Sequence, residues 1–140
     1  PTTFVCNRQS LLVKNLNDIT EIVKSGKGQI LDARSLGRFN GTEPEPRAGM
    51  RSGHMPGAIS LPFTEFLDPD SKTYISSEKI THLIEKLNID LNQPITTTCG
   101  SGVTACALSL GLFLIGKTDV AVYDGSWSEW GALSDTSIAQ

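Results

Sequence analysis

The most informative stretch of the sequence spans residues 96–116 and reads TTTCGSGVTACALSLGLFLIG. Three threonines lead into Cys99, a glycine–serine–glycine turn follows, and a long apolar segment runs to Gly116. β-Branched residues favour strands, glycine permits tight turns, and a segment that is apolar on nearly all sides is typical of a buried helix. The stretch therefore predicts a strand, a short loop and a buried helix over residues 103–115, with Cys99 at the carboxyl end of the strand.

Strands and helices are predicted to alternate along the rest of the chain. Helical periodicity marks residues 16–24, with Asn17 as the expected N-cap, and residues 80–87, preceded by Ser76 and Ser77 as caps. Brief apolar runs predict four strands, at residues 29–33, 58–63, 94–99 and 119–125.

This alternation is typical of an α/β domain, in which a mainly parallel central sheet carries helices on both faces. Ligands bind in such folds at the edge where the carboxyl ends of the strands meet. A loop rich in glycine, proline and charged residues covers residues 34–58, directly after the first predicted strand. Because a loop of this length in a compact domain is usually functional, we expect it to meet Cys99 at that edge.

Composition narrows the class of protein. A chain of 140 residues with 39% apolar side chains fits one soluble globular domain. The net charge of −3 argues against a nucleic-acid surface, the apolar run at residues 105–115 is too short to span a bilayer, and no signal peptide is recognisable. We therefore expect neither nucleic-acid nor membrane partners. Because the chain begins at Pro1 rather than methionine, we expect it to be processed or to be cut from a longer protein.

The three cysteines, Cys6, Cys99 and Cys106, are predicted to act singly. Their number is odd and their spacing matches no paired motif, which disfavours a disulfide scaffold or a structural zinc site. This usage is typical of a reducing compartment. Cys106 falls inside the apolar helix and is interpreted as core filler, whereas Cys6 receives no role.

The loop after Cys99 has the chemistry of an anion site. Backbone amides from Gly100 to Thr104 can turn inward, and the following helix adds the positive end of its dipole. These groups should lower the pKa of the Cys99 thiol from about 8.5 and could equally hold a persulfide. A buried structural cysteine and a phosphatase nucleophile are the alternatives. The phosphatase is disfavoured because no arginine or lysine lies between Cys99 and Lys117 to grip a phosphoryl group.

Three segments carry a resemblance to a known family. CGSGVTAC at residues 99–106 resembles the active-site loop of 3-mercaptopyruvate sulfurtransferases of the rhodanese family. LDARSLGRFNGTEPEPRAGMRSGHMPGAISLPF at residues 31–63 and YDGSWSEWG at 123–131 resemble two further family signatures, in the same order. The resemblance implies a rhodanese-like three-layer fold, with residues 1–13 as a linker and 14–140 as the catalytic domain. It also implies a companion N-terminal rhodanese domain outside this chain.

The resemblance also implies roles for individual residues. Cys99 is the nucleophile that accepts sulfur, Ser101 polarises the substrate or supports the cysteine, and Arg38 and Arg47 bind the carboxylate and keto oxygens of 3-mercaptopyruvate. The backbone around the bound sulfur is supplied by Gly100, Gly102, Val103 and Thr104. Pyruvate leaves, and a thiol acceptor, such as a small dithiol or a thioredoxin-like protein, or cyanide, removes the sulfur. Neither a metal nor an organic cofactor is expected, and the expected compartment is the cytoplasm or the mitochondrion.

Two alternatives within the family remain open. A thiosulfate sulfurtransferase is disfavoured because such enzymes typically carry basic residues in the loop, where this chain has Ser101. A non-catalytic sulfur carrier or docking module is the other. Several nearby side chains are interpreted as structural: the pair Asp32 and Arg34, His54 in a turn, His82 on the surface, Trp127 and Trp130 in the C-terminal turn, and Tyr123 and Asp124 after the last strand.

Overall fold

The computed structural model, which describes residues 2–3 and 5–140, contains a parallel sheet of five strands in the order β1-β5-β4-β2-β3. The strands are β1 (Val13–Lys14), β2 (Gln29–Asp32), β3 (Ile59–Ser60), β4 (Ile95–Thr98) and β5 (Ala121–Tyr123). The predicted parallel α/β architecture is therefore confirmed. The sheet also begins earlier than expected, because Val13, assigned to the linker, already pairs with Val122 of β5.

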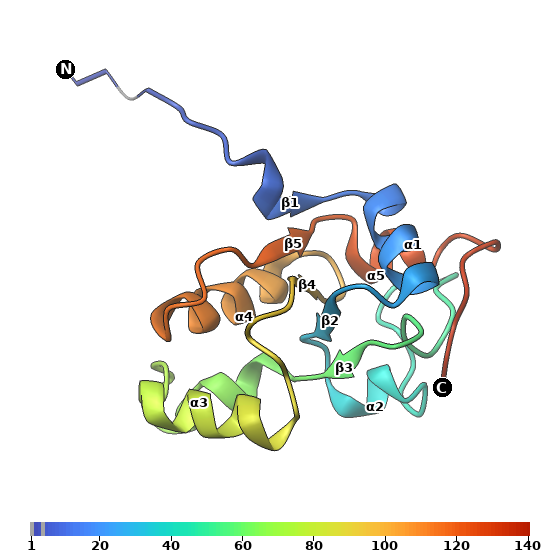
Figure 1. The fold of residues 1–140 in the computed structure, drawn as a ribbon. Coiled ribbons are helices and arrows are strands. Elements are labelled where there is room, and N and C mark those ends of the chain that lie inside the picture. The colour runs from blue at the N-terminus through green and yellow to red at the C-terminus, as the bar shows by residue number, and fades with distance from the viewer. Residues whose placement is uncertain (1, 4) are drawn as a thin grey trace.

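Helices cover both faces of the sheet, as predicted (Figure 1). They are α1 (Leu16–Ser25), α2 (Leu36–Phe39), α3 (Ser77–Lys86), α4 (Val103–Leu114) and α5 (Ser126–Trp130), with 3-10 turns η1 (Ser10–Leu12) and η2 (Phe63–Phe66). Adjacent residues of β2 point to opposite faces. Leu31 joins the core under α3 and α4, whereas Ile30 joins the core under α1 and α5. The domain therefore has three layers.

The helix caps follow the expected chemistry with one correction. Ser76 caps α3 by accepting a hydrogen bond from the Lys79 amide. The N-cap of α1 is Asn15 and not Asn17, because the Asn15 side chain accepts from the amides of Asn17 and Asp18 while the Asp18 carboxylate accepts from the Asn15 amide. This reciprocal capping box fixes the turn between β1 and α1.

The interpretation of α4 as buried on all sides is wrong. Leu108 and Leu112 are fully buried against the sheet, but Val103, Leu110 and Phe113 are 73%, 49% and 56% exposed. Cys106 lies on the exposed side as well, so it is not core filler; its thiol donates a hydrogen bond to the Gly102 carbonyl over 3.4 Å. The helix is therefore covered on one face only, although its sequence is apolar on nearly all sides.

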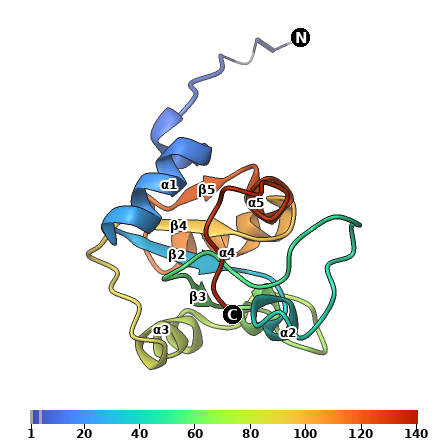
Figure 2. The same ribbon diagram turned by 90° about the vertical axis from the view of Figure 1, so that its right-hand side faces the viewer.

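The sheet order creates a crevice between β2 and β4. After β2 the chain moves outward to β3, and after β4 it moves the other way to β5, so the two neighbouring strands send their loops apart. Such a switch point is where open parallel sheets bind ligands. Figures 1 and 2 place α2, which follows β2, and α5, which follows β5, at the same end of the sheet.

The unequal faces of α4 can be measured by denaturation. We expect Leu108→Ala to lower the free energy of unfolding by about 2–5 kcal/mol, because it opens a cavity in the core. Leu110→Ala, on the same helix but half exposed, should change it by less than about 1 kcal/mol. Equal losses in urea titrations of the two variants would show that both faces are packed.

Candidate active site

Cys99 follows β4 directly and is 2% exposed. The Gly102 amide donates a hydrogen bond to the Cys99 sulfur over 3.1 Å. Gly102 has φ +86°, which favours glycine, and a Cβ on it would lie 2.9 Å from the carbonyl oxygen of Asp124. The glycine is therefore needed both to turn amides toward the sulfur and to let the loop approach the end of β5.

The electrostatics of the loop favour the thiolate form of Cys99. Burial raises the pKa of the thiol, since it removes water from the charged form. Hydrogen bonds from the Thr104 hydroxyl and from the amides of Ala105, Ser101 and Thr104 lower it by more, so the pKa lies below its ordinary value. The predicted lowering is confirmed in direction, and the opposing causes identify a sulfur that is both dry and stabilised as an anion.

The segment after β5 holds the backbone of the Cys99 loop. The Ser126 hydroxyl accepts a hydrogen bond from the Cys99 amide over 3.1 Å and donates to the Tyr123 carbonyl over 2.9 Å. The amides of Trp127 and Ser128 donate to the carbonyls of Cys99 and Gly100 at 2.9 and 2.8 Å. Ser126 is fully buried with φ +50°, an unusual value for a serine, which shows how strongly these contacts fix it.

Arg34 joins the loop after β2 to the rest of the site. Its side chain is fully buried and bonds Asp32 at 2.7 Å, as predicted, and also Glu45 at 2.8 Å and the Gly53 carbonyl at 2.8 Å. The guanidinium carbon lies 4.2 Å from the centre of a Trp127 ring. Trp127 therefore does more than pack the C-terminal turn, because it forms one wall of this charged cluster.

Arg38 lies beside the loop that follows Cys99. Its side chain is 23% exposed, and a Cβ on Gly100 would lie 2.9 Å from its Nη2 atom. Glu45 accepts from Nε over 3.2 Å and from Nη2 over 2.5 Å. The arginine is thus anchored along one edge.

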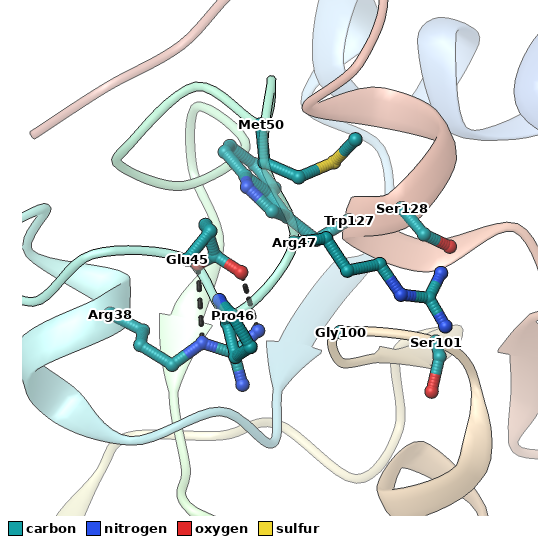
Figure 3. A pocket seen from close by; sticks show the side chains of 9 residues that line it. All are labelled: Arg38, Glu45, Pro46, Arg47, Met50, Gly100, Ser101, Trp127 and Ser128. Carbon is teal, nitrogen blue, oxygen red and sulfur yellow. Dashed lines mark hydrogen bonds and ion pairs between the residues drawn. The ribbon is translucent and has the colours of Figure 1, made fainter.

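A cavity of about 210 Å³ opens between these segments (Figure 3). It is lined by Arg38, Glu45, Pro46, Arg47, Met50, Gly100, Ser101, Trp127 and Ser128. Arg47 is exposed, and in Figure 3 its side chain extends toward Ser101 and Ser128. An opening with two guanidinium groups at its wall is suited to a small anion.

The structure brings most of the predicted site residues together. Arg38, Arg47, Gly100 and Ser101 line the cavity, and Gly102 and Thr104 lie against the Cys99 sulfur. Val103 does not line the cavity, and its side chain points to solvent.

Sequence reasoning missed Glu45, Ser126 and Ser128. Glu45 had a detectable signal, an acid between two candidate arginines in EPEPR, but the two serines had none.

Other structural interpretations of nearby residues hold. The His54 Nδ1 atom lies 2.9 Å from the Phe39 carbonyl oxygen, and His82 is exposed.

Within residues 2–3 and 5–140 no group of three or more histidine, cysteine or acidic side chains is arranged to hold a metal ion. Across the same residues, no helix has the length and apolar character needed to cross a membrane.

The pH dependence of alkylation tests the Thr104 contact. Because the folded pKa of Cys99 is lowered, the thiolate persists below the ordinary range, and its reaction with iodoacetamide should have a midpoint below about pH 8.5. Thr104→Val removes one hydrogen bond to the thiolate and should raise that midpoint, whereas Thr104→Ser should retain it. Peptide-resolved mass spectrometry separates Cys99 from the other cysteines. A midpoint unchanged in Thr104→Val would contradict this role for the hydroxyl.

The support from Ser126 can be tested through stability. Ser126→Ala leaves the buried amide of Cys99 without its acceptor, and we expect the free energy of unfolding to fall by about 1–3 kcal/mol. Ser101→Ala, whose side chain is exposed, serves as the control and should change stability by less than about 0.5 kcal/mol. Similar urea midpoints for the two variants would disprove the supporting role.

Comparisons with known proteins agree with this geometry. The chain is 47% identical over 130 residues to human 3-mercaptopyruvate sulfurtransferase, covering 93% of this chain and 43% of that protein. It is also 43% identical over 143 residues to rat thiosulfate sulfurtransferase, covering all of this chain and 48% of that protein. The chain therefore spans less than half the length of either relative.

A solved structure and a domain signature extend the comparison. The crystal structure of the Tum1 protein from Saccharomyces cerevisiae superposes with a TM-score of 0.82 at 40% identity, covering 91% of this chain and 45% of that one. The signature of the Rhodanese-like domain matches residues 15–133, which include every strand except β1 and the whole cavity. The chain belongs to the rhodanese-like domain family.

Proposed function

We propose that this domain transfers sulfur from 3-mercaptopyruvate through a persulfide on Cys99. The observation that carries the proposal is a buried cysteine of lowered pKa next to a small cavity whose wall holds Arg38 and Arg47. The relatives of this chain include 3-mercaptopyruvate and thiosulfate sulfurtransferases. Sulfur transfer is common to both, so the question that remains is which donor this domain uses.

The donor follows from the shape and charge of the cavity. 3-Mercaptopyruvate has a planar carboxylate next to a keto oxygen, and two guanidinium groups can bind such oxygens in pairs. Arg47 lines the cavity and is exposed, so it can meet the carboxylate as the donor enters. Arg38 lies against Gly100, the residue that follows Cys99, and is suited to the keto oxygen.

The first half of the reaction loads the cysteine. The Cys99 thiolate attacks the donor sulfur, a sulfur–sulfur bond forms, and the carbon–sulfur bond breaks. The electron pair of that bond passes to pyruvate as its enolate, which then takes up a proton. Arg38 and Arg47 stabilise the negative charge on the enolate oxygen, and Ser101 can donate a hydrogen bond there.

The second half of the reaction removes the outer sulfur from the Cys99 persulfide. The amides and the Thr104 hydroxyl that favour the thiolate can also hold the persulfide anion. A second thiol, or cyanide, attacks the outer sulfur and restores Cys99 as the leaving thiolate. A small dithiol or a thioredoxin-like protein is the expected acceptor. Two easier steps thus replace one difficult transfer, and neither step calls for a metal or an organic cofactor.

Two further candidates have support of their own. Thiosulfate as donor is supported by the similarity to rat thiosulfate sulfurtransferase, but the loop from Gly100 to Thr104 has no cation for a dianion. A carrier or docking module is supported by the span of the chain, which is less than half the length of these two relatives. Placement in the cytoplasm or the mitochondrion stays a prediction.

Intact mass after incubation with each donor separates these possibilities. With 3-mercaptopyruvate we expect one added sulfur atom that dithiothreitol removes, together with one pyruvate released. Cys99→Ser should show neither, whereas Cys106→Ser, which alters an exposed thiol, should behave like the unaltered chain. Faster loading from thiosulfate would favour the second donor, and no loading from either would contradict sulfur transfer by this domain.

A further inference from the structure

The Glu45 carboxylate lies between two arginines and away from water. Its side chain is 4% exposed, and it bonds Arg34 through Nη1 at 2.8 Å and Arg38 through Nη2 at 2.5 Å. A buried carboxylate needs such partners, because an unpaired buried charge is strongly unfavourable. The two arginines differ in role, since Arg34 is fully buried and Arg38 lines the cavity.

A chain of contacts connects the buried core to the wall of the cavity and holds Arg38 in place. Arg34 is fixed by Asp32, by the Gly53 carbonyl and by the ring of Trp127. Glu45 is fixed by Arg34 and in turn holds the Nε and Nη2 edge of Arg38. Within the described part of the chain, the Nη1 atom of Arg38 has no hydrogen-bond acceptor, so that end of the fork remains available to a ligand.

Glu45 also sets the charge of the cavity. The charged side chains that line it are Arg38, Arg47 and Glu45, which sum to one positive charge. Asp32 and Arg34 lie behind them as a fully buried neutral pair. The Cys99 thiolate beside the cavity adds a further negative charge, so a dianionic donor meets stronger repulsion there than a monoanionic donor does, and the Glu45 carboxylate contributes to that difference.

We propose that Glu45 determines donor specificity: by holding one edge of Arg38 and cancelling one of two positive charges, it makes the cavity select a monoanionic sulfur donor over a dianionic one. This inference rests on the proposed sulfur transfer and names a determinant that lies outside the catalytic loop. Glu45 does not touch the reacting atoms, so it is a positioning residue that acts through Arg38.

The test compares two donors on three proteins. Rates of sulfur loading on Cys99 are measured by quenched mass spectrometry with 3-mercaptopyruvate and with thiosulfate, and their ratio is taken. Glu45→Gln retains the shape but removes the charge, and we expect the thiosulfate to mercaptopyruvate ratio to rise about tenfold. Glu43→Gln is the matched control: it makes the same charge change on the same loop, but Glu43 is exposed and bonds Ser35 outside the cavity. Its ratio should stay within twofold of the unaltered chain.

The outcomes separate the inference from the function on which it rests. A ratio unchanged in Glu45→Gln, or raised equally in Glu43→Gln, overturns the specificity role while sulfur transfer stands. Absence of loading from both donors in the unaltered chain overturns the proposed function and this role together. A rise confined to Glu45→Gln supports the inference.

A second measurement needs neither turnover nor a stable Glu45→Gln protein. Pyruvate, a monoanion, and sulfate, a dianion, are compared for their ability to protect Cys99 of the unaltered chain from iodoacetamide. We expect pyruvate to protect at a lower concentration than sulfate. Stronger protection by sulfate would show that the cavity prefers a dianion even though Glu45 is present. That result would overturn the inference.

Discussion

The buried guanidinium of Arg34 connects the three segments that meet at the active site. It bonds Asp32 at the end of β2, Glu45 in the long loop, and lies over Trp127 in the segment after β5. Charges with no exposure lose their hydration, so the cluster contributes little net stability compared with an apolar core. Removal of one partner, however, leaves an uncompensated charge at a cost of about 3–5 kcal/mol. The cluster therefore contributes mainly to specificity, because its contacts are satisfied in only one arrangement of the three segments.

A similar balance of costs operates at Cys99. Burial disfavours the thiolate, and the amides and hydroxyl of the loop favour it more strongly. The carbonyls of Cys99 and Gly100 accept hydrogen bonds from Trp127 and Ser128, which helps to hold the loop in the conformation that directs these groups at the sulfur. The helix α4 and the C-terminal segment therefore act on the Cys99 sulfur from two sides. The sulfur is buried away from water, which strengthens every electrostatic contact made to it.

Sequence reasoning succeeded where the signal was local. Strand–turn–helix patterns located Cys99 and its loop, and the topology of a parallel sheet placed the long loop of residues 34–58 at the same edge. The family resemblance then singled out Arg38 and Arg47 within that loop. It failed where a contact joins distant parts of the chain. The support of Cys99 by Ser126 spans 27 residues and depends on a backbone angle that a serine rarely adopts. Periodicity also misjudged α4, because an apolar side chain such as Leu110 carries no information on whether its face is covered.

The position of Glu45 shows why an arginine in the wall of a binding cavity benefits from a carboxylate partner. A free arginine side chain loses rotamer entropy when it binds a ligand, and that loss reduces the binding free energy. With one edge bonded to Glu45, Arg38 has lost part of this freedom before any ligand arrives. The Glu45 carboxylate also cancels one positive charge. The Arg38 guanidinium is therefore better oriented, but the cavity attracts an anionic ligand less strongly. Where the ligand carries a single charge and its keto oxygen must meet the guanidinium at one angle, orientation matters more than the total charge, and a paired arginine is the better solution.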